Sequence, residues 1–240
     1  EQTTADYRSE FGRITHSLQM ADTFADWCSL YRRLTSWEIE LEDSTDRSIK
    51  EVLTYQKGEA NQAFSKFVRR NYYDWINKRT DDSPVMSHTL MRSKIFPVAD
   101  ENAKTTLLLI DNFRYDQWRA ISSLLRGYYD VATEDFYCAI LPTATQYARN
   151  AIFAGLMPLA IDRLMPDKWL NDNEEGGKNQ YEEEFLRRLM AQNGKQWKFS
   201  FDKLVRPEQG RRLVDNIQKV YDADFSVIVY NLLDILSHAR

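Results

Sequence analysis

Three sites after residue 105 carry side chains that could bind a metal or attack phosphorus. They are Asp111, Thr145 and the pair Asp234 and His238. Each follows an expected strand or begins an expected helix, and ligands of open α/β sheets gather beyond the carboxyl ends of the strands. These side chains are therefore candidates for one site, provided that the fold brings them to the same edge of a sheet.

Asp111 directly follows the apolar run of residues 105–110. A carboxylate at the end of a buried strand could bind a divalent metal, cap the following helix, or accept phosphate as in a receiver domain. A receiver needs an acidic pair after an earlier strand, whereas the upstream sequence has the apolar spacing of helices. The receiver alternative is therefore disfavoured, and the metal ligand and the helix cap stay open.

Thr145 follows the Pro-containing turn 142–144, at the start of an expected helix. Free backbone N–H groups and the positive end of the helix dipole favour a phosphate at such a position. A metal bound to the hydroxyl oxygen would make it a nucleophile at neutral pH. Taken alone, the residue is better explained as a plain helix cap.

Asp234 and His238 are four residues apart, so on a helix they share one face, one turn apart. Carboxylate and imidazole together suit zinc, although a pair at this spacing also occurs without a metal. Neither His16 nor His88 follows an acidic residue at this spacing in the sequence, and we interpret both as structural.

The elements that must position these residues alternate between strands and helices after residue 105. Apolar runs predict strands at 105–110 and 225–230, and a further strand within 128–140. Helices are predicted at 115–125, with Trp118, Ile121 and Leu125 inward, at 146–153 closed by Gly155, at 181–190 and at 209–220, with a mobile loop at 171–180. This alternation predicts an α/β fold with a mostly parallel sheet and flanking helices.

The pattern of apolar residues predicts helices from about residue 6 to 79. An apolar stripe from Tyr7 to Leu34 predicts one amphipathic helix, and a stripe from Ile49 to Ile76 predicts another, after a capping turn at 43–46. Residues 80–84 break the helix, and a polar connector leads to Lys104. We therefore expect a helical linker or dimerisation domain at 1–95, with aromatic side chains in its core or dimer interface, and an α/β domain at 105–240.

Composition narrows the class of protein. The chain has 240 residues, 43% of them hydrophobic, and a net charge of −4, which argues against a non-specific nucleic-acid binder. Cys28 and Cys138 are expected to be reduced, and the lack of a long apolar stretch or signal peptide predicts a cytoplasmic protein. The start at Glu1 and the stop at Arg240 inside an expected helix predict a piece of a longer protein.

One stretch alternates basic and aromatic side chains. It comprises Lys195, Trp197, Lys198, Phe199, Phe201 and Lys203. Such residues could contact a nucleotide chain by charge and stacking. The simpler alternative is an ordinary strand with one solvated face.

Three stretches, in their order and context, resemble the alkaline-phosphatase superfamily. They are residues 107–111, residues 141–155, and the pair Asp234 and His238. Within that superfamily, residues 110–118 and 145–155 are similar to the PglZ domain. The resemblance covers residues 105–240. With the helical segment before it, the whole chain resembles the PorX-type response regulators of the type IX secretion system, in which a receiver domain precedes the helices.

The resemblance implies a site with two zinc ions. Asp111 and Thr145 match a ligand and the nucleophile at one zinc, and Asp234 and His238 match two ligands of the other. Arg149 and Asn112 would contact phosphate. The family also needs a later Asp–His pair and a further His, which this chain lacks, so the fragment is expected to be inactive while the intact protein is active.

The resemblance also implies a function and partners. It points to a phosphodiesterase or phosphatase in a two-component regulator, with oligonucleotides as candidate substrates. Its partners would be a receiver domain, a sensor kinase, and a sigma factor or secretion-system component, and it would form a homodimer. The alternatives are a non-catalytic module that relays receiver phosphorylation to dimerisation and partner binding, and an α/β binding domain without metal.

Overall fold

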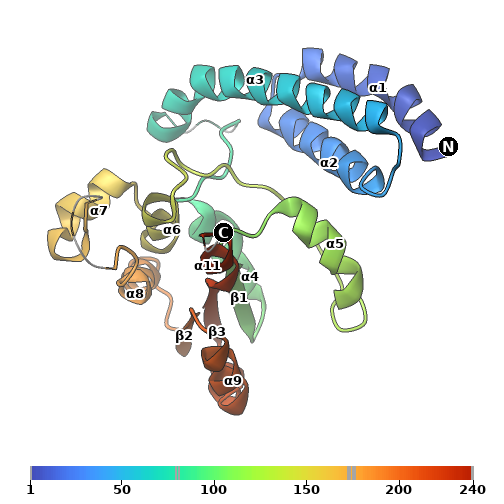
Figure 1. Cartoon of the computed structure of the whole chain (residues 1–240). Helices are drawn as coiled ribbons and strands as arrows, with labels where there is room; N and C mark the ends of the chain where they lie inside the picture. The colour runs from blue at the N-terminus through green and yellow to red at the C-terminus, as the bar shows by residue number, and fades with distance from the viewer. Residues whose placement is uncertain (1, 79, 81, 172–173, 175–176, 239–240) are drawn as a thin grey trace. The chain divides into compact units, whose positions relative to one another are not determined.

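The computed structural model describes residues 2–78, 80, 82–171, 174 and 177–238 (Figure 1). The side chains of residues 2–4, 232 and 238 lie outside this description. The chain divides into two compact units, which we call the helical unit (Glu1–Pro84 with Arg114–Phe136) and the α/β unit (Val85–Phe113 with Tyr137–Arg240). Each is described by itself below.

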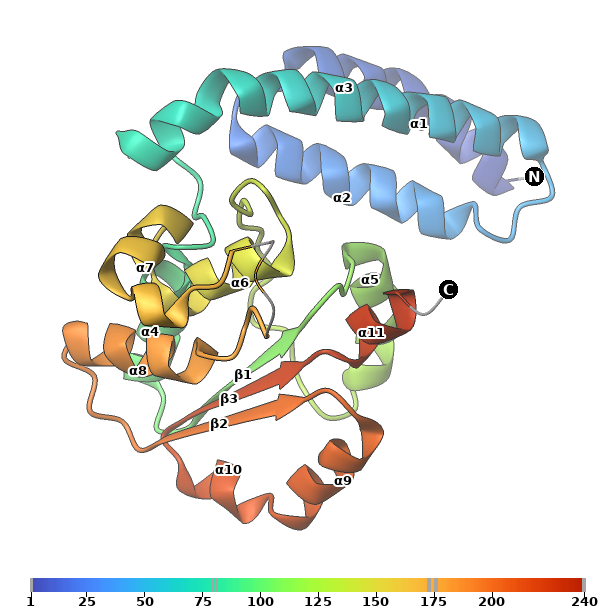
Figure 2. The ribbon, with the colours of Figure 1, turned by 60° about the vertical axis from the view of Figure 1, so that its left-hand side comes forward.

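The helical unit is built from long helices that lie side by side (Figures 1 and 2). They are α1 (Gln2–Met20), α2 (Phe24–Glu40) and α3 (Arg47–Asn77), and the shorter α5 (Tyr115–Leu125) packs against α2. The expected N-terminal helical region is confirmed.

Aromatic rings fill much of the interior of the helical unit. The ring of Phe67 lies 5.8 Å from that of Trp27 and 5.5 Å from that of Trp75, measured between centroids. Nearby, the hydroxyl of Tyr7 donates a 2.9 Å hydrogen bond to Gln56 Oε1, and both residues are almost fully buried. The aromatic stripes of the sequence therefore serve as core.

The prediction of one continuous helix from Tyr7 to Leu34 was wrong. The chain breaks after Met20, because Thr23 caps a new helix: its hydroxyl accepts the N–H of Asp26 at 3.2 Å. The Asp26 carboxylate in turn accepts the N–H of Thr23 at 2.9 Å, which completes a capping box. The predicted cap before α3 is confirmed, since Asp46 Oδ1 accepts the N–H of Ser48 at 3.0 Å.

The α/β unit contains a parallel three-stranded sheet in the order β1-β3-β2 (Figure 2). Its strands are β1 (Thr105–Ile110), β2 (Phe199–Leu204) and β3 (Phe225–Tyr230). Thr105 and Phe199 both pair with Phe225, so the three strands start level with one another. The mixed α/β class and the strands at 105–110 and 225–230 are confirmed.

One face of the sheet carries the main core of this unit. Phe225, Val227 and Val229 of β3 pack with apolar side chains of α6 (Thr145–Ala154) and α8 (Glu182–Gln192). Ser226 points to the opposite face, where its hydroxyl donates to the carbonyl of Val220 at 3.2 Å. The central strand is therefore covered on both faces, as its near-continuous apolar sequence predicts.

The remaining elements of the α/β unit are short. They are a π-helix (Met91–Ile95), α4 (Phe96–Glu101), α7 (Pro158–Leu164), a 3₁₀ turn (Pro166–Lys168), α9 (Pro207–Asp215), α10 (Gln218–Asp222) and α11 (Leu232–His238). The stretch from residue 84 to 104 is thus not the polar connector that was expected. Met91 and Phe96 are buried there, and the proline in the first turn of α4 is compatible with a helix start.

Two further element predictions were wrong. Residues 128–140 form no strand and contribute only an isolated bridge between Met86 and Cys138. Two residues later, the backbone N–H of Ile140 bonds to the Ser87 side chain, so the pairing with a neighbouring strand does not continue. The helix expected at 209–220 is divided into α9 and α10. Asn216 is the C-cap of α9, where a φ of −113° leaves the helical range.

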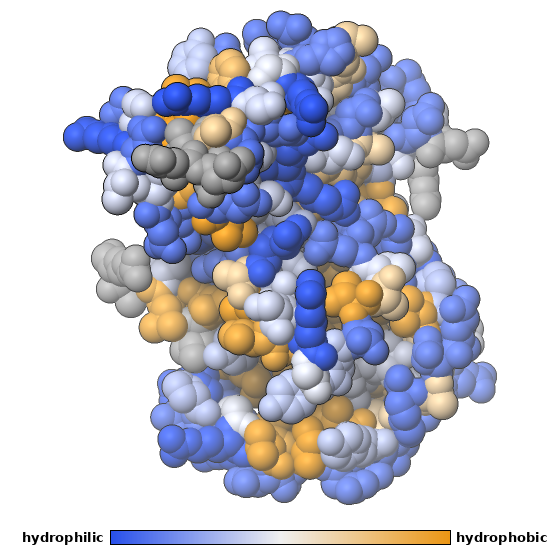
Figure 3. All heavy atoms as spheres, turned by 90° about the vertical axis from the view of Figure 1, so that its right-hand side faces the viewer, coloured by the Kyte–Doolittle hydropathy of each residue, from blue (hydrophilic) through white to orange (hydrophobic). Residues whose placement is uncertain are grey.

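The inward face predicted for α5 is also wrong. Ile121 is 38% exposed and Leu125 36% exposed, while the half-buried Trp118 donates its indole N–H to Glu134 at 3.0 Å. Figure 3 shows apolar side chains reaching the surface in separate groups among polar ones on the face it presents. Within the described residues, no helix combines the length and apolar character that a membrane crossing needs. Neither Cys28 nor Cys138 forms a disulfide in the part of the chain that the structure describes.

Candidate functional site

Asp111 stands at the carboxyl edge of the sheet. Its backbone N–H bonds to the Tyr230 carbonyl at 3.0 Å, so it continues the pairing of β1 with β3. Its side chain is 16% exposed. Asn112 then turns the chain with a φ of +58°, and the N-cap of the next helix is Arg114. Asp111 is therefore not the helix cap that the sequence alone had left open.

Thr145 is the first residue of α6, whose N-cap position is taken by Ala144. Ala144 offers no side-chain oxygen, so the free N–H groups of the first turn have no side-chain cap. The Thr145 hydroxyl instead donates to Asp111 Oδ2 at 3.4 Å. Two residues that are 34 positions apart thus meet at the sheet edge. The predicted closure of α6 by Gly155 is confirmed by its left-handed φ of +61°.

Arg149 lies on α6 one turn after Thr145 and is only 4% exposed. Its Nη1 donates to Asp111 Oδ2 at 2.7 Å and to Asn231 Oδ1 at 2.8 Å, and its Nε donates to Glu182. Asn231 directly follows β3. Arg149 therefore joins the ends of two neighbouring strands to helix α8, and these two nitrogens are already engaged by protein groups.

Glu182, the first residue of α8, is 1% exposed and pairs with two cations. Beyond Arg149, its partner is Lys203 of β2, with Nζ 2.9 Å from Oε2. The sequence placed Glu182 only within the helix predicted at 181–190. The spacing along the helix offered a stronger signal that Glu182 is buried. Glu182 precedes Phe185, Leu186 and Leu189 by three, four and seven residues, so it lies on the same buried face of α8.

Helix α11, which carries Asp234 and His238, is tied to the residue after Asp111. Asn112 Nδ2 donates to Ser237 Oγ at 2.7 Å, and Ser237 Oγ donates to the Asp234 carbonyl at 2.7 Å. The first of these bonds ties the last turn of α11 to the residue that follows Asp111. The side chain of His238 lies outside the described residues, so its part in the site stays a prediction.

The donor set for a metal ion can be judged on the described residues alone. Among them, no three His, Cys, Asp or Glu side chains gather closely enough to hold an ion. Asp111 and Thr145 bring two oxygens together, and Arg149 already pairs with one carboxylate oxygen of Asp111. A tetrahedral zinc site needs four ligands, so these two donors are a partial set.

The basic and aromatic stretch before and within β2 faces inward for the most part. Trp197, Phe199 and Phe201 pack against the core, and Lys195 Nζ bonds to Asp100 Oδ1 at 2.7 Å. Lys198, in contrast, is exposed. The rings are therefore used for packing rather than for a stacking surface.

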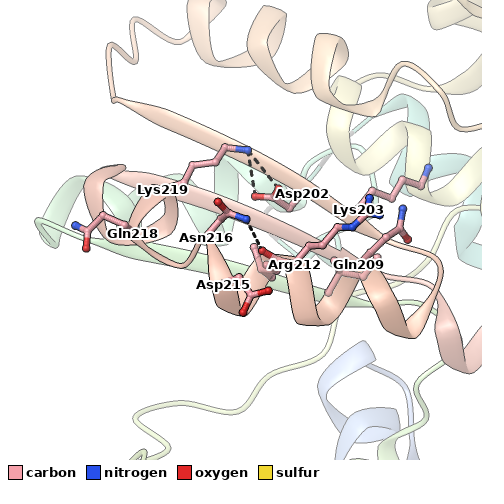
Figure 4. A pocket seen from close by; sticks show the side chains of 10 residues that line it. Asp202, Lys203, Gln209, Arg212, Asp215, Asn216, Gln218 and Lys219 are labelled. Carbon is pink, nitrogen blue, oxygen red and sulfur yellow. Dashed lines mark hydrogen bonds and ion pairs between the residues drawn. The ribbon is translucent and has the colours of Figure 1, made fainter.

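An open cavity of about 550 Å³ lies between β2 and helices α9 and α10 (Figure 4). Its lining is mostly polar, and Lys219 within it pairs with Asp202 at 3.2 Å. Asp111, Thr145 and Arg149 do not line it. The cavity is thus not formed by these three residues, although Lys203 of β2 lines it.

Comparison with known protein families gives two matches. Residues 1–76 match the PorX response regulator linker domain, and residues 90–240 match the BREX system PglZ alkaline phosphatase-like domain. No curated protein matches the chain. A PorX-type linker domain thus precedes an alkaline phosphatase-like domain, as the sequence resemblance predicted. Because the second match spans well over half of its residues, the chain belongs to the PglZ alkaline phosphatase-like family.

Proposed function

We propose that this chain contributes to a zinc-dependent phosphoester hydrolase in which Thr145 is the nucleophile. The observation that carries the proposal is the hydrogen bond from the Thr145 hydroxyl to Asp111 Oδ2, 3.4 Å long, at the carboxyl edge of a parallel sheet. The match to an alkaline phosphatase-like domain supports a hydrolase. In this proposal Asp111, Thr145, Asp234 and His238 are zinc ligands, and zinc lowers the pKa of the nucleophile and stabilises charge on phosphate oxygens when bound.

The protein groups divide the remaining work. The Thr145 hydroxyl points its hydrogen at Asp111 Oδ2, which leaves an oxygen lone pair free to attack phosphorus. The uncapped N–H groups at the start of α6 would receive the phosphate oxygens. In the first step the bond from Thr145 Oγ1 to phosphorus forms, the bond to the leaving oxygen breaks, and the proton released by the hydroxyl ends on the leaving oxygen. Water then hydrolyses the phosphothreonine and restores the hydroxyl.

Phosphodiesters, including oligonucleotides, are the substrates we propose. The observation in favour is the linker match over residues 1–76, which likens this chain to a PorX response regulator. In that setting a receiver domain and a sensor kinase would control the hydrolase, a homodimer would form through the helical unit, and the output would be type IX secretion through a sigma factor or secretion component. A non-catalytic relay is the second candidate function, and the same linker match favours it.

The test compares Thr145→Ala with Thr143→Ala in the intact protein. Thr143 stands two residues earlier in the turn and is exposed, so it controls for the loss of a hydroxyl. We expect Thr145→Ala to lower kcat on a chromogenic phosphodiester about 1,000-fold or more, as removal of a nucleophile does, and to abolish a covalent phosphoryl adduct on the peptide that contains residue 145. Equal activity of the two variants would exclude Thr145 as nucleophile and leave the relay.

A further inference from the structure

We propose that Glu182 and Lys203 are positioning residues of the candidate site, because they hold Arg149 and the Thr145 turn in place through one closed ring of polar contacts. The catalytic consequence rests on the function proposed above. The ring itself rests only on the contacts of the described residues, so the two ideas can fail separately.

The first half of the ring runs through charged side chains. Lys203 Nζ donates to Glu182 Oε2 at 2.9 Å, Glu182 Oε1 accepts the Nε–H of Arg149, and Arg149 Nη1 donates to Asp111 Oδ2 at 2.7 Å. Positive and negative groups alternate along this path, so Glu182 lies between two cations and Arg149 between two carboxylates. The path leads from β2 through α8 and α6 to the end of β1.

The second half of the ring runs through Asn179, which lies just before α8. Lys203 Nζ also donates to the Asn179 carbonyl at 2.8 Å, and Asn179 Nδ2 donates to the Thr145 carbonyl at 3.2 Å. The bond from the Thr145 hydroxyl to Asp111 Oδ2 then closes the ring. The ammonium group of Lys203 therefore holds both halves of the ring. One half leads through Glu182 to Asp111, and the other leads through Asn179 to the backbone of Thr145.

Burial explains why this ring would hold the site firmly. Glu182 is 1% exposed and Arg149 4% exposed, so little water reaches these two groups, whereas the Lys203 side chain is 30% exposed. A buried charge that loses its partner is strongly unfavourable, and hydrogen bonds to ionised groups are directional and strong. Partners that bond to the groups meeting substrate fix the orientation of those groups. Lys203 thus acts through the ring, whereas the sequence had offered it as a nucleotide contact.

The kinetic experiment compares Lys203→Met with Lys203→Arg and Lys198→Met in the intact protein. Lys203→Met keeps the apolar stem but removes both donations, so we expect kcat to fall about 10–100-fold with KM unchanged within about twofold, as for other outer partners. Lys203→Arg can reach two acceptors and should recover most of kcat. Lys198→Met removes an exposed lysine just before the same strand and should leave both constants unchanged.

Two results would overturn the proposal. One is an unchanged kcat in Lys203→Met. The other is a rise in KM for an oligonucleotide that Lys198→Met shares, since that would make Lys203 part of a nucleotide-binding surface. Circular dichroism at the assay temperature confirms that the variants remain folded.

A second readout needs no catalysis and so separates this inference from the proposed function. Exchange of the Arg149 Nε–H with water, followed by NMR, should be at least about 10-fold faster in Glu182→Gln than in the wild type, because the charge-assisted bond is lost. Glu183→Gln, one position along α8 and partly exposed, should leave it unchanged. Unchanged exchange in Glu182→Gln would overturn the ring even in an active enzyme, whereas an inactive wild type with the expected exchange would overturn only the hydrolase.

Discussion

The two units of this chain bury different kinds of polar group. In the helical unit the buried polar side chains are neutral, and Tyr7 bonds to Gln56 within a core of aromatic rings. In the α/β unit Arg149 and Glu182 are buried as ions, in contact with Asp111 at the sheet edge. Both descriptions refer to the part of the chain that the structure describes.

The difference distinguishes buried side chains that pack a core from buried side chains that position a functional group. A neutral pair can be exchanged for apolar groups at small net change in stability. A buried ion pair often contributes less to stability than apolar residues of the same size, yet losing one partner is very unfavourable. Ions are therefore an expensive way to hold helices together but a precise way to fix a neighbouring carboxylate. This argues that the helical unit is built for shape and the α/β unit for placement of Asp111 and Thr145.

The largest effect is expected from Arg149→Met. It leaves Glu182 and Asp111 without their shared cation, so we expect a loss of about 4 kcal/mol in the free energy of unfolding of the α/β unit. Native-state hydrogen exchange of peptides from α6 and α8 measures it. The control is Arg187→Met, since Arg187 is 54% exposed and pairs with Glu183 on the surface of α8, and it should change stability by less than about 1 kcal/mol.

The double variant Arg149→Met with Glu182→Gln sharpens this test. Removing both charges should recover part of the loss, because position 182 then no longer carries a buried charge that has lost a partner. If the double variant loses as much stability as the sum of the two single variants predicts, the two ions are not coupled and the contrast between the units is lost.

Elements with a strong local signal could be predicted from the sequence, and elements that depend on a partner could not. The apolar runs before Asp111 and Asn231 gave β1 and β3, because a strand buried on both faces needs such a run. The strand expected within 128–140 had suitable side chains but found no neighbouring strand for its backbone, apart from one bridge. The break between α1 and α2 depends on Thr23 and Asp26, a capping signal inside an otherwise continuous stripe.

The next effect belongs to the helical unit. Phe67 is 4% exposed, and its ring contacts Trp27, Phe64 and Trp75. Phe67→Ala should lower the free energy of unfolding of this unit by about 3 kcal/mol, since it leaves a cavity in the aromatic core. The proposed hydrolase activity on a small phosphodiester should not change at a temperature where the protein is folded. Loss of activity alongside an intact fold would show that the helical unit also helps to place the site.

A smaller effect is expected from Tyr7→Phe, which removes the bond to Gln56 and should lower stability by about 1 kcal/mol near neutral pH. Burial raises the pKa of Tyr7 from 10.0 to about 12. The unfolded chain therefore releases this proton at lower pH than the folded one, and the wild type loses stability as pH rises from 10 to 12. Tyr7→Phe lacks this loss, so urea unfolding should show its deficit shrinking or reversing over that range. A deficit that stays constant would place Tyr7 in contact with water.

The part of the site that could be predicted from the sequence consists of polar residues at the ends of expected strands and helices. Asp111 and Thr145 stood out because each adjoins an expected element, and the structure brings them within hydrogen-bonding reach. The roles of Arg149, Glu182 and Lys203 could not be derived in the same way. Their contacts join α6, α8 and β2, and only the tertiary fold decides which charges meet. The zinc ligands, with the His238 side chain outside the described residues, stay predictions.

The smallest stability effects come from two threonines near helix starts, and they separate a capping role from a chemical one. Thr23 is a true cap, because its hydroxyl accepts the N–H of Asp26, so Thr23→Ala should lower the stability of α2 by about 1 kcal/mol. Thr145 follows the cap Ala144 and turns its hydroxyl to Asp111, so Thr145→Ala should change stability by less than about 0.5 kcal/mol. Hydrolysis should show the reverse order, unchanged in the first variant and lost in the second. If Thr145→Ala instead destabilises α6 as much as Thr23→Ala destabilises α2, the Thr145 hydroxyl stabilises the start of the helix. That result would argue against Thr145 as the nucleophile.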